Sequence, residues 1–249
     1  MGKPHPWLIV GDERAWENAC RHMDTFTLVG SIAIVVVGLT THEAAHAWAA
    51  DRLGDPTARL MGRLTLNPLP HIDLMMTIVL PLMLLMTTGM AFGGAKPVPV
   101  QVHRMQNPMK SMALVAIAGP ASNFLQAVFW SAVMSAFLHF GVWDDFESRG
   151  ISILVIGIFF NLVLMAFNLV PIPPLDGSRV VYYFLGHNAR KAYGKLERHG
   201  IFLVFAIIIL FRDAFWSLLF VVIEPMLKFI FWITSVPDAD RLFQQVFLS

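Results

Sequence analysis

The sequence predicts an all-α polytopic membrane protein, and two observations lead to this fold class. The first is composition: 56% of the 249 residues are hydrophobic, only 14% are charged, and the mean hydropathy is +0.62. Soluble domains carry roughly 45–50% apolar and about 25% charged residues, so this chain has too little charge to cover a water-facing surface. The second is a series of uncharged runs, several of them near the length of about 20 residues that spans a bilayer as a helix.

The same composition argues against other classes of protein. The net charge is only +1, whereas nucleic-acid-binding proteins carry a strongly basic surface. Cys20 is the single cysteine, so the chain can form neither an internal disulfide nor a cysteine-based metal cluster.

The predicted membrane segments follow from the positions of the charges. Residues 1–24 are rich in charged side chains and lack the pattern of a removable signal peptide, so we expect an N-terminal arm at the membrane interface. Five runs with little charge follow: Thr25–Thr41 (continuing as a helix to about Ala50), Leu74–Ala95, Ser111–Trp143, Gly150–Leu175 and Ile201–Pro237. The last run is interrupted by charged residues, so it predicts either one span with an interfacial helix or two short spans.

The links between these runs differ in charge. The links after Ala50, before Ser111 and after Leu175 are basic, whereas residues 144–149 are mostly acidic. Basic loops favour the cytoplasmic side of a membrane. We therefore expect a multi-pass protein of the cell membrane with the three basic links inside and the acidic link outside.

The sharpest chemical signal is His42-Glu43-Ala44-Ala45-His46, the pattern H-E-x-x-H, at the end of the first run. Residues four apart lie one turn apart on the same face of a helix, so both imidazoles can bind one Zn²⁺. Glu43 is placed to accept a proton from water that the zinc activates. The alternative is a chance match, but ionisable side chains that end an uncharged run are costly in a membrane unless they are used.

A third ligand is expected in Asn168–Gly177, where three prolines prevent the fourth run from continuing as a helix. Unwound backbone with a carboxylate at membrane depth is tolerated where it lines a cavity or a site. We therefore predict that Asp176 is an oxygen ligand and that Gly177 permits a tight turn behind it. The alternative is that Asp176 only caps a helix that starts near Ser178.

The third run contains a further motif, Gly119-Pro120-Ala121-Ser122-Asn123. Gly119 allows another helix to come close, and Pro120 frees a backbone carbonyl inside the helix. Asn123 brings a donor and an acceptor into an apolar setting. Two roles remain open for it: contact with substrate or a developing oxyanion, or an interhelical hydrogen bond that supports packing.

With these motifs in this order, the chain resembles the site-2 protease family, integral-membrane zinc metalloproteases that cut other membrane proteins within or near their transmembrane segments. The resemblance rests on His42–His46, Gly119–Asn123 and Asn168–Gly177, and the combination is far more specific than any one motif. Gly54–Arg59 and Lys96–Val100 also look like the compact bacterial and archaeal branch of the family, which lacks PDZ and CBS domains.

The resemblance implies an organisation and a set of residue roles. It implies a three-helix catalytic core with a re-entrant or β-hairpin-like membrane element at 25–180. This core lies between the interfacial arm expected at 1–24 and the amphipathic and membrane helices expected at 181–249. The implied partners are transmembrane protein substrates and the lipid bilayer, with no nucleic acid. The implied site residues are the Zn²⁺ ligands His42, His46 and Asp176, the general base Glu43 and, more weakly, Asn123 for substrate or oxyanion contact.

The metal site also constrains the topology. One zinc ion must contact the ends of the first and fourth runs, so these ends belong to the same side of the membrane, which we expect to be cytoplasmic. A single crossing by Leu74–Ala95 would separate them. We therefore predict that Leu74–Ala95 dips into the membrane and returns, although an uncharged run of this length ordinarily indicates a plain span. The alternative is that Leu60–Asp73 also crosses, in extended form.

Two further expectations follow. Lys96–Val100 has β-branched residues at alternate positions and two prolines, so we expect an exposed strand edge to which an unwound substrate segment can add. The rival to a protease is a non-catalytic membrane protein that binds or transports metal, because intramembrane His and Asp also serve ion pathways. Glu43 favours the protease, since hydrolysis requires a base beside the metal and transport does not.

Overall fold

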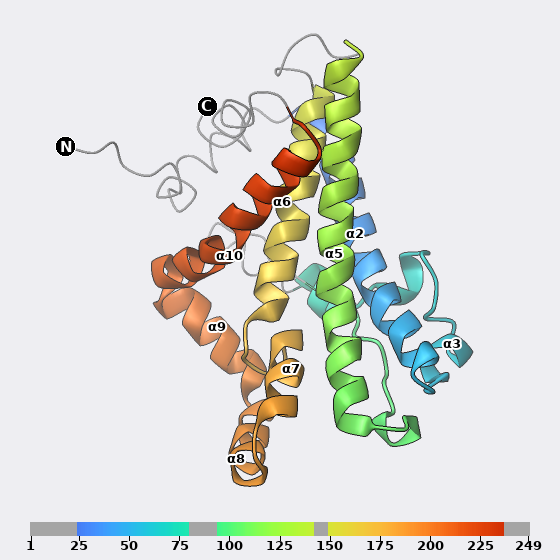
Figure 1. Ribbon diagram of the computed structural model, residues 1–249, viewed down its shortest axis with the longest axis vertical. Helices are drawn as coiled ribbons and strands as arrows, with labels where there is room; N and C mark the ends of the chain where they lie inside the picture. Colours follow the sequence, from blue (N-terminus) through green and yellow to red (C-terminus); the bar gives the residue numbers. More distant parts are fainter. Residues whose placement is uncertain (1–23, 80–93, 142–148, 237–249) are drawn as a thin grey trace, which may run out of the picture. The chain divides into compact units, whose positions relative to one another are not determined.

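The computed structural model describes residues 24–79, 94–141 and 149–236, and within these ranges the chain forms helices and no strand (Figure 1). The predicted all-α fold class is therefore confirmed for the described part of the chain. The expected arm at 1–24 lies outside this part except for Asp24. Residues 80–93 of the predicted re-entrant element and most of the acidic link at 144–149 also lie outside it.

Four of the helices are long and apolar enough to cross a membrane, and they coincide with four of the five predicted runs. The α-helices are α2 (Thr25–Arg52), α3 (Thr57–Leu60), α5 (Pro108–His139), α6 (Arg149–Leu169), α7 (Asp176–Phe184), α8 (His187–Glu197), α9 (Gly200–Leu210) and α10 (Arg212–Ile233), and the four of spanning length are α2, α5, α6 and α10. Short 3-10 turns occupy Leu69–His71 and Val102–Arg104, and a π-helical turn occupies Leu74–Val79.

The last run, Ile201–Pro237, contains one helix of spanning length and one that is too short. α9 has 11 residues, which corresponds to about 16 Å at 1.5 Å per residue, against a hydrocarbon core of about 30 Å. α10 has 22 residues and reaches the required length. Of the two alternatives left open by the sequence, two short spans are therefore not observed.

The described residues form two compact units, and unit 1 comprises those within Met1–Val35, Leu125–Val163 and Asp213–Ser249. In unit 1, glycines allow α2 and α6 to approach each other closely. A Cβ atom on Gly30 would lie 2.4 Å from Cδ1 of Ile153, and one on Gly157 would lie 2.8 Å from Cγ2 of Ile34. Small residues at such contacts are typical of membrane helices, whose association depends on close packing.

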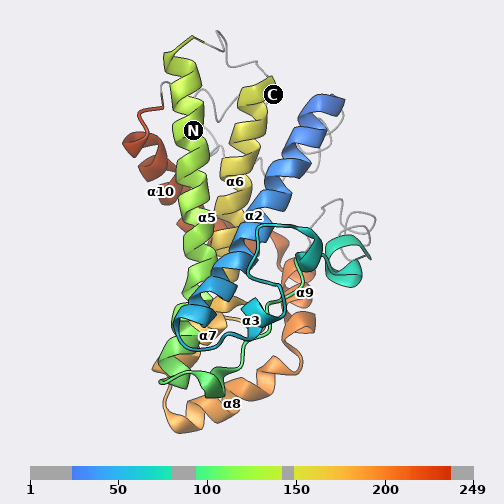
Figure 2. The same ribbon diagram turned by 90° about the vertical axis from the view of Figure 1, so that its right-hand side faces the viewer.

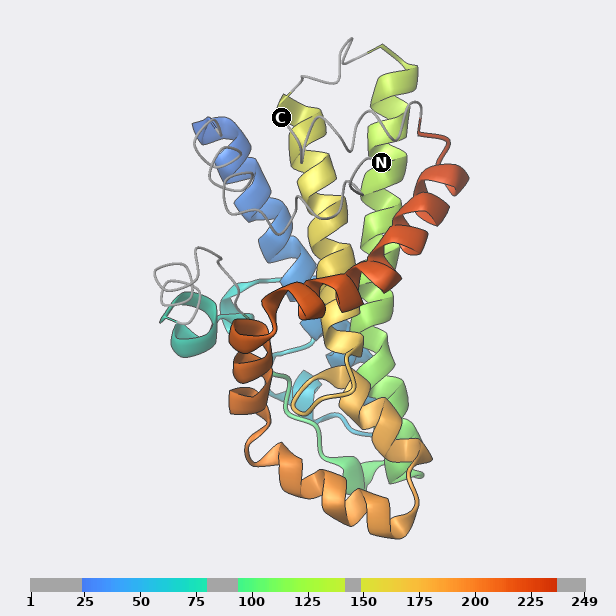
Figure 3. The same cartoon turned by 90° about the vertical axis from the view of Figure 1, so that its left-hand side faces the viewer.

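Unit 2 comprises the described residues within Val36–Phe124 and Leu164–Arg212. The second half of α2 lies beside the first half of α5 in this unit, and the two helices run in opposite directions (Figure 2). α6 ends in unit 2, and α7, α8 and α9 follow it along a path that turns back between α8 and α9 (Figure 3). All of the predicted site residues belong to this unit.

The two flanks of residues 80–93 lie against each other in unit 2. The Thr77 hydroxyl donates a hydrogen bond to the Gly94 carbonyl at 2.8 Å, and the Lys96 N–H donates to the His71 carbonyl at 2.8 Å. Lys96–Val100 follows without helix or strand pairing, so the strand edge expected there is not observed. The physical reason is that two prolines in the segment lack the amide hydrogens that a strand ladder uses.

Candidate metal centre

α2 presents His42 and His46 on one face, and α5 fixes the orientation of both rings. Nδ1 of His42 lies 2.6 Å from Oδ1 of Asn123, and Nδ1 of His46 lies 2.8 Å from the carbonyl oxygen of Val115. Because these oxygens are acceptors, each Nδ1 carries the hydrogen and each Nε2 keeps its lone pair. The two Nε2 atoms lie 3.0 Å apart, and both side chains are buried. Both rings are therefore oriented as metal ligands.

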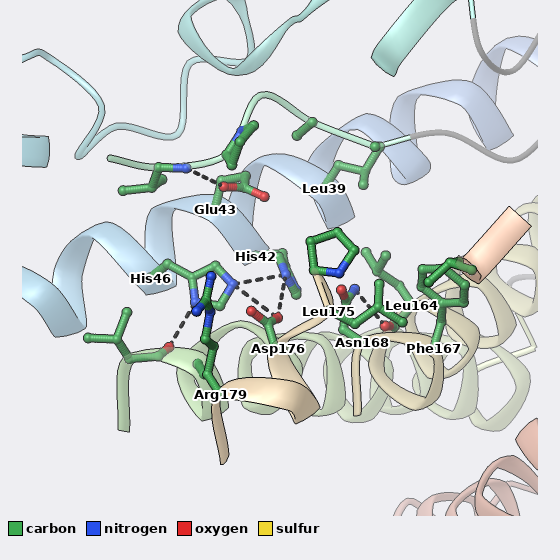
Figure 4. Close-up of a pocket in the computed structure, with 18 of the residues that line it drawn as sticks. Leu39, His42, Glu43, His46, Leu164, Phe167, Asn168, Leu175, Asp176 and Arg179 are labelled. Atoms are coloured by element: carbon green, nitrogen blue, oxygen red, sulfur yellow. Dashed lines mark hydrogen bonds and ion pairs between the residues drawn. The ribbon is translucent and has the colours of Figure 1, made fainter. Parts of the chain in front are cut away.

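Asp176 completes a group of three ligand atoms. Its Oδ2 lies 3.4 Å from Nε2 of His42 and 3.3 Å from Nε2 of His46 (Figure 4). This buried oxygen has no hydrogen-bond partner in the structure. Three lone pairs therefore meet at one point, and a cation between them satisfies all three. Four-coordinate zinc with bonds of about 2.0–2.1 Å separates neighbouring ligand atoms by roughly 3.3 Å, so these residues fit Zn²⁺.

The chain places Asp176 at the first position of α7. α6 ends at Leu169, and the prolines that follow cannot continue it. Leu175 is the N-cap residue and no side chain caps α7, so the alternative of Asp176 as a cap is not observed. We expected Gly177 to permit a tight turn, but it is not one of the glycines with a left-handed backbone conformation. Instead it allows a close approach of backbone, because a Cβ atom there would lie 2.1 Å from the Leu169 carbonyl oxygen.

Gly119 allows α5 to approach the two histidines. A Cβ atom on Gly119 would lie 2.4 Å from Nε2 of His46 and 2.6 Å from Cε1 of His42. The expectation that this glycine admits a neighbouring helix is therefore confirmed, and the groups that it admits are the candidate zinc ligands. Any larger residue at this position would displace them.

Asn123 lies behind His42 and not on the cavity. Its side chain is fully buried, its Oδ1 accepts from Nδ1 of His42, and its Nδ2 donates to the Gly38 carbonyl at 3.4 Å. Asn123 is absent from the residues that line the cavity beside the ligands. Of the two roles that the sequence left open, this geometry is that of the interhelical hydrogen bond, with a candidate zinc ligand as the partner.

A cavity of about 460 Å³ opens onto the three ligand side chains (Figure 4). Its volume lies within the range of about 300–1,000 Å³ that is usual for ligand sites. Its polar lining consists of His42, Glu43, His46, Asn168, Asp176 and Arg179, and most of the remaining wall is aliphatic or aromatic. The cavity therefore accommodates an apolar chain segment and directs it towards a few polar groups.

Glu43 lies at this cavity and is held by backbone from another segment. Its Oε2 accepts a hydrogen bond from the Val98 N–H at 3.2 Å (Figure 4). The carboxylate is half-buried, and it is not one of the three grouped ligand atoms. The structure thus separates the predicted base from the predicted ligands while it keeps all four side chains on one cavity.

The sequence did not identify three contributors to the cavity. The Val98 amide could have been noticed as the N–H that stands between Pro97 and Pro99. Arg179 follows Asp176 by three residues and so lies near it on α7, where it forms an ion pair with Glu197. α9 contributes Ile201, Val204, Phe205 and Ile208, which share one helix face. No pattern marked that face, because nearly every residue of α9 is apolar.

The chain is similar to known protein families and proteins. A model of peptidase family M50 matches residues 138–211, which include Asp176. The protein named "Putative zinc metalloprotease YwhC" of Bacillus subtilis is 37% identical over 179 residues, which cover 71% of this chain and 78% of that protein.

Two relatives are mycobacterial. Rip2 of Mycolicibacterium smegmatis, also named as a zinc metalloprotease, is 32% identical over 207 residues, covering 80% of this chain and 75% of that protein. Rip2 of Mycobacterium tuberculosis is 28% identical over 199 residues, covering 77% of this chain and 72% of that protein. No solved structure matches the chain significantly.

The position of Asn123 predicts an effect on metal affinity. We expect Asn123→Ala to weaken zinc binding by about 10–100-fold, because His42 loses the acceptor that fixes its tautomer and ring orientation. Competition with a chromophoric chelator on the purified chain measures this affinity. Asn161→Ala is the control, since that buried asparagine bonds to the Gly157 carbonyl in unit 1. Unchanged zinc affinity with a loss of turnover would instead assign Asn123 to oxyanion contact.

Proposed function

Because the chain belongs to peptidase family M50, the site-2 protease family, and is a zinc metalloprotease, we propose that it hydrolyses peptide bonds within or near the transmembrane segments of other membrane proteins. The observation that carries this proposal is the position of the metal centre on helices of spanning length. His42 and His46 lie on α2, and Asp176 follows α6. The apolar wall of the cavity beside them suits the side chains of a transmembrane segment.

In this proposal, His42, His46 and Asp176 hold the zinc and Glu43 is the general base. When bound, zinc supplies a Lewis acid that polarises the scissile carbonyl and lowers the pKa of water. The Glu43 carboxylate accepts a proton from the attacking water and returns it to the leaving amine nitrogen. The Nδ1 hydrogen bonds of the histidines hold both rings in the orientation that presents Nε2 to the metal.

The substrate must expose its backbone before it can react. A transmembrane helix uses its carbonyl groups in its own hydrogen bonds, so the segment to be cut has to unwind locally. Pro97, Val98 and Val100 line the same cavity as the ligands. This placement puts an irregular segment of the protein beside the unwound substrate. In this proposal the catalytic core comprises residues 25–180.

We also propose a multi-pass topology in the cell membrane with the metal centre on the cytoplasmic side and Leu74–Ala95 re-entrant. Three observations support it. α2 and α5 are antiparallel neighbours, so the chain between them crosses the membrane an even number of times. The hydrogen bond from Thr77 to Gly94 also brings the flanks of the element together. The basic links after α2, before α5 and after α6 favour the cytoplasm.

The rival proposal, a membrane protein that binds or transports metal without catalysis, is less favoured. A transporter needs the three ligands but has no need of a further carboxylate, beyond Asp176, on the same cavity. Glu43 is such a carboxylate, and it is fixed by a backbone hydrogen bond. This arrangement supports hydrolysis.

Substitution of Glu43 separates the two proposals. We expect Glu43→Gln to retain zinc and to lose cleavage of a model single-span substrate by at least about 100-fold, because the amide cannot accept the proton. Zinc content and fragment yield of the purified chain are the two measurements. Equal cleavage by the wild type and the variant would exclude the protease mechanism.

Cysteine labelling tests the topology. In a Cys20→Ser background, we expect an impermeant thiol reagent to reach Arg59→Cys and Arg104→Cys from the same side of the membrane. Phe140→Cys, at the far end of α5, should be reached from the opposite side. Each of these three positions is exposed in the structure. If Arg59→Cys and Arg104→Cys reacted from opposite sides, Leu74–Ala95 would cross once and the re-entrant proposal would be wrong.

A further inference from the structure

Arg63, which follows α3, is a buried cation outside the metal centre. Only 6% of its surface is exposed. Nη1 donates to the Pro70 carbonyl, and Nη2 donates to the carbonyl of Lys96 at 2.6 Å and to that of Pro97 at 3.2 Å. No carboxylate forms an ion pair with it within the described part of the chain. A buried charge held by carbonyls alone is costly, so a function for it is to be expected.

The Pro97–Val98 peptide group connects Arg63 to the metal centre. Its carbonyl oxygen accepts from Nη2 of Arg63, and its N–H donates to Oε2 of Glu43 at 3.2 Å. The C=O and N–H of a trans peptide group point in opposite directions. One peptide group therefore stands between the guanidinium and the carboxylate. In such a chain the cation polarises the peptide and strengthens its N–H as a donor.

The two prolines of this segment leave Val98 as the one residue among 97–99 whose backbone can donate a hydrogen bond. Pro97 and Pro99 have no N–H, so Val98 supplies the one amide hydrogen of these three residues. Glu43 uses this hydrogen. A shift of the segment by one residue would offer the carboxylate no donor, so the position of the segment along the cavity determines whether Glu43 is held.

The far end of the segment is also anchored. Oδ2 of Asp55, which is fully buried, accepts from the Gln101 N–H at 2.6 Å, and its Oδ1 accepts from the Thr57 N–H at 3.1 Å. Burial alone would raise the pKa of Asp55. These hydrogen bonds, together with one from the Thr57 hydroxyl, lower the pKa by more than burial raises it, so it lies below its usual value. The anchor is therefore charged at neutral pH, and Arg63 and Asp55 fix the segment on either side of Val98.

We propose that Arg63 is a positioning residue for the general base: through the Pro97–Val98 peptide group it holds Glu43 in the orientation in which the carboxylate accepts the proton of the attacking water. This inference rests on the proposed role of Glu43. Arg63 contacts neither the ligands nor the cavity. Its effect is on the turnover step and not on zinc or substrate affinity.

The test compares variants of the full chain in the cleavage of a model single-span substrate. We expect Arg63→Met, which keeps the aliphatic bulk and removes the donors, to lower kcat by up to about 100-fold, since small misplacements of a catalytic group have such effects. KM should change by no more than about twofold, and zinc content should not change. Arg63→Lys, which can still donate to a carbonyl, should recover part of the loss. Arg59→Met is the control, because Arg59 is exposed and pairs with Asp51.

If Arg63→Met does not fold, a second pair of variants tests the connection through the Pro97–Val98 peptide group. Val98→Pro removes the amide hydrogen that Glu43 accepts, and Val98→Ala keeps it. We expect a loss of kcat in Val98→Pro well beyond that in Val98→Ala, with zinc retained in both. Equal turnover in the two would overturn the inference, as would loss of zinc or a rise in KM alone in Arg63→Met. Cleavage by Glu43→Gln would instead contradict the proposed function itself.

Discussion

The metal centre depends on one constraint: two neighbouring imidazoles must both present the lone pair of Nε2 to the same point. Neutral imidazole has one donor and one acceptor nitrogen, and nothing within α2 decides which is which. α5 decides it, because the Val115 carbonyl and the Asn123 amide oxygen each accept from an Nδ1. The orientation of both rings, with each Nε2 directed towards Asp176, follows from these two hydrogen bonds.

Close packing of helices makes these hydrogen bonds possible. α5 reaches the histidines because Gly119 has no side chain, and α7 starts against the end of α6 because Gly177 has none. At Gly119 the missing Cβ leaves room for the two imidazole rings, and at Gly177 it leaves room for the Leu169 carbonyl. The site is therefore built from the same close contacts that hold membrane helices together, so packing and chemistry cannot be varied independently at these positions.

The sequence predicted the parts of the site that depend on the spacing of residues within one segment. His42 and His46 share one helix face with Glu43 next to the first of them, and the prolines after Leu169 predicted that α6 would end before Asp176. The sequence could not assign Asn123, because an asparagine beside a helix contact can face a ligand or a cavity, and only the position of α2 decides between them. It also missed Arg63 and the Val98 amide, since their roles arise from contacts between segments more than thirty residues apart. The strand edge expected at Lys96–Val100 is not observed in the described part of the chain, where alternation of β-branched residues does not compensate for two missing donors.

We infer that His42, His46 and Asp176 together hold one zinc ion. Zinc-edge X-ray absorption on the purified chain, with metal content measured on the same sample, tests it most directly. We expect one zinc per chain, with nitrogen and oxygen neighbours only and the outer-shell scattering of two imidazoles. In Asp176→Ala the zinc content should fall, whereas Asp213→Ala, at an exposed position on α10, should retain it. Full zinc content with an unchanged spectrum in Asp176→Ala would show that Asp176 is not a ligand.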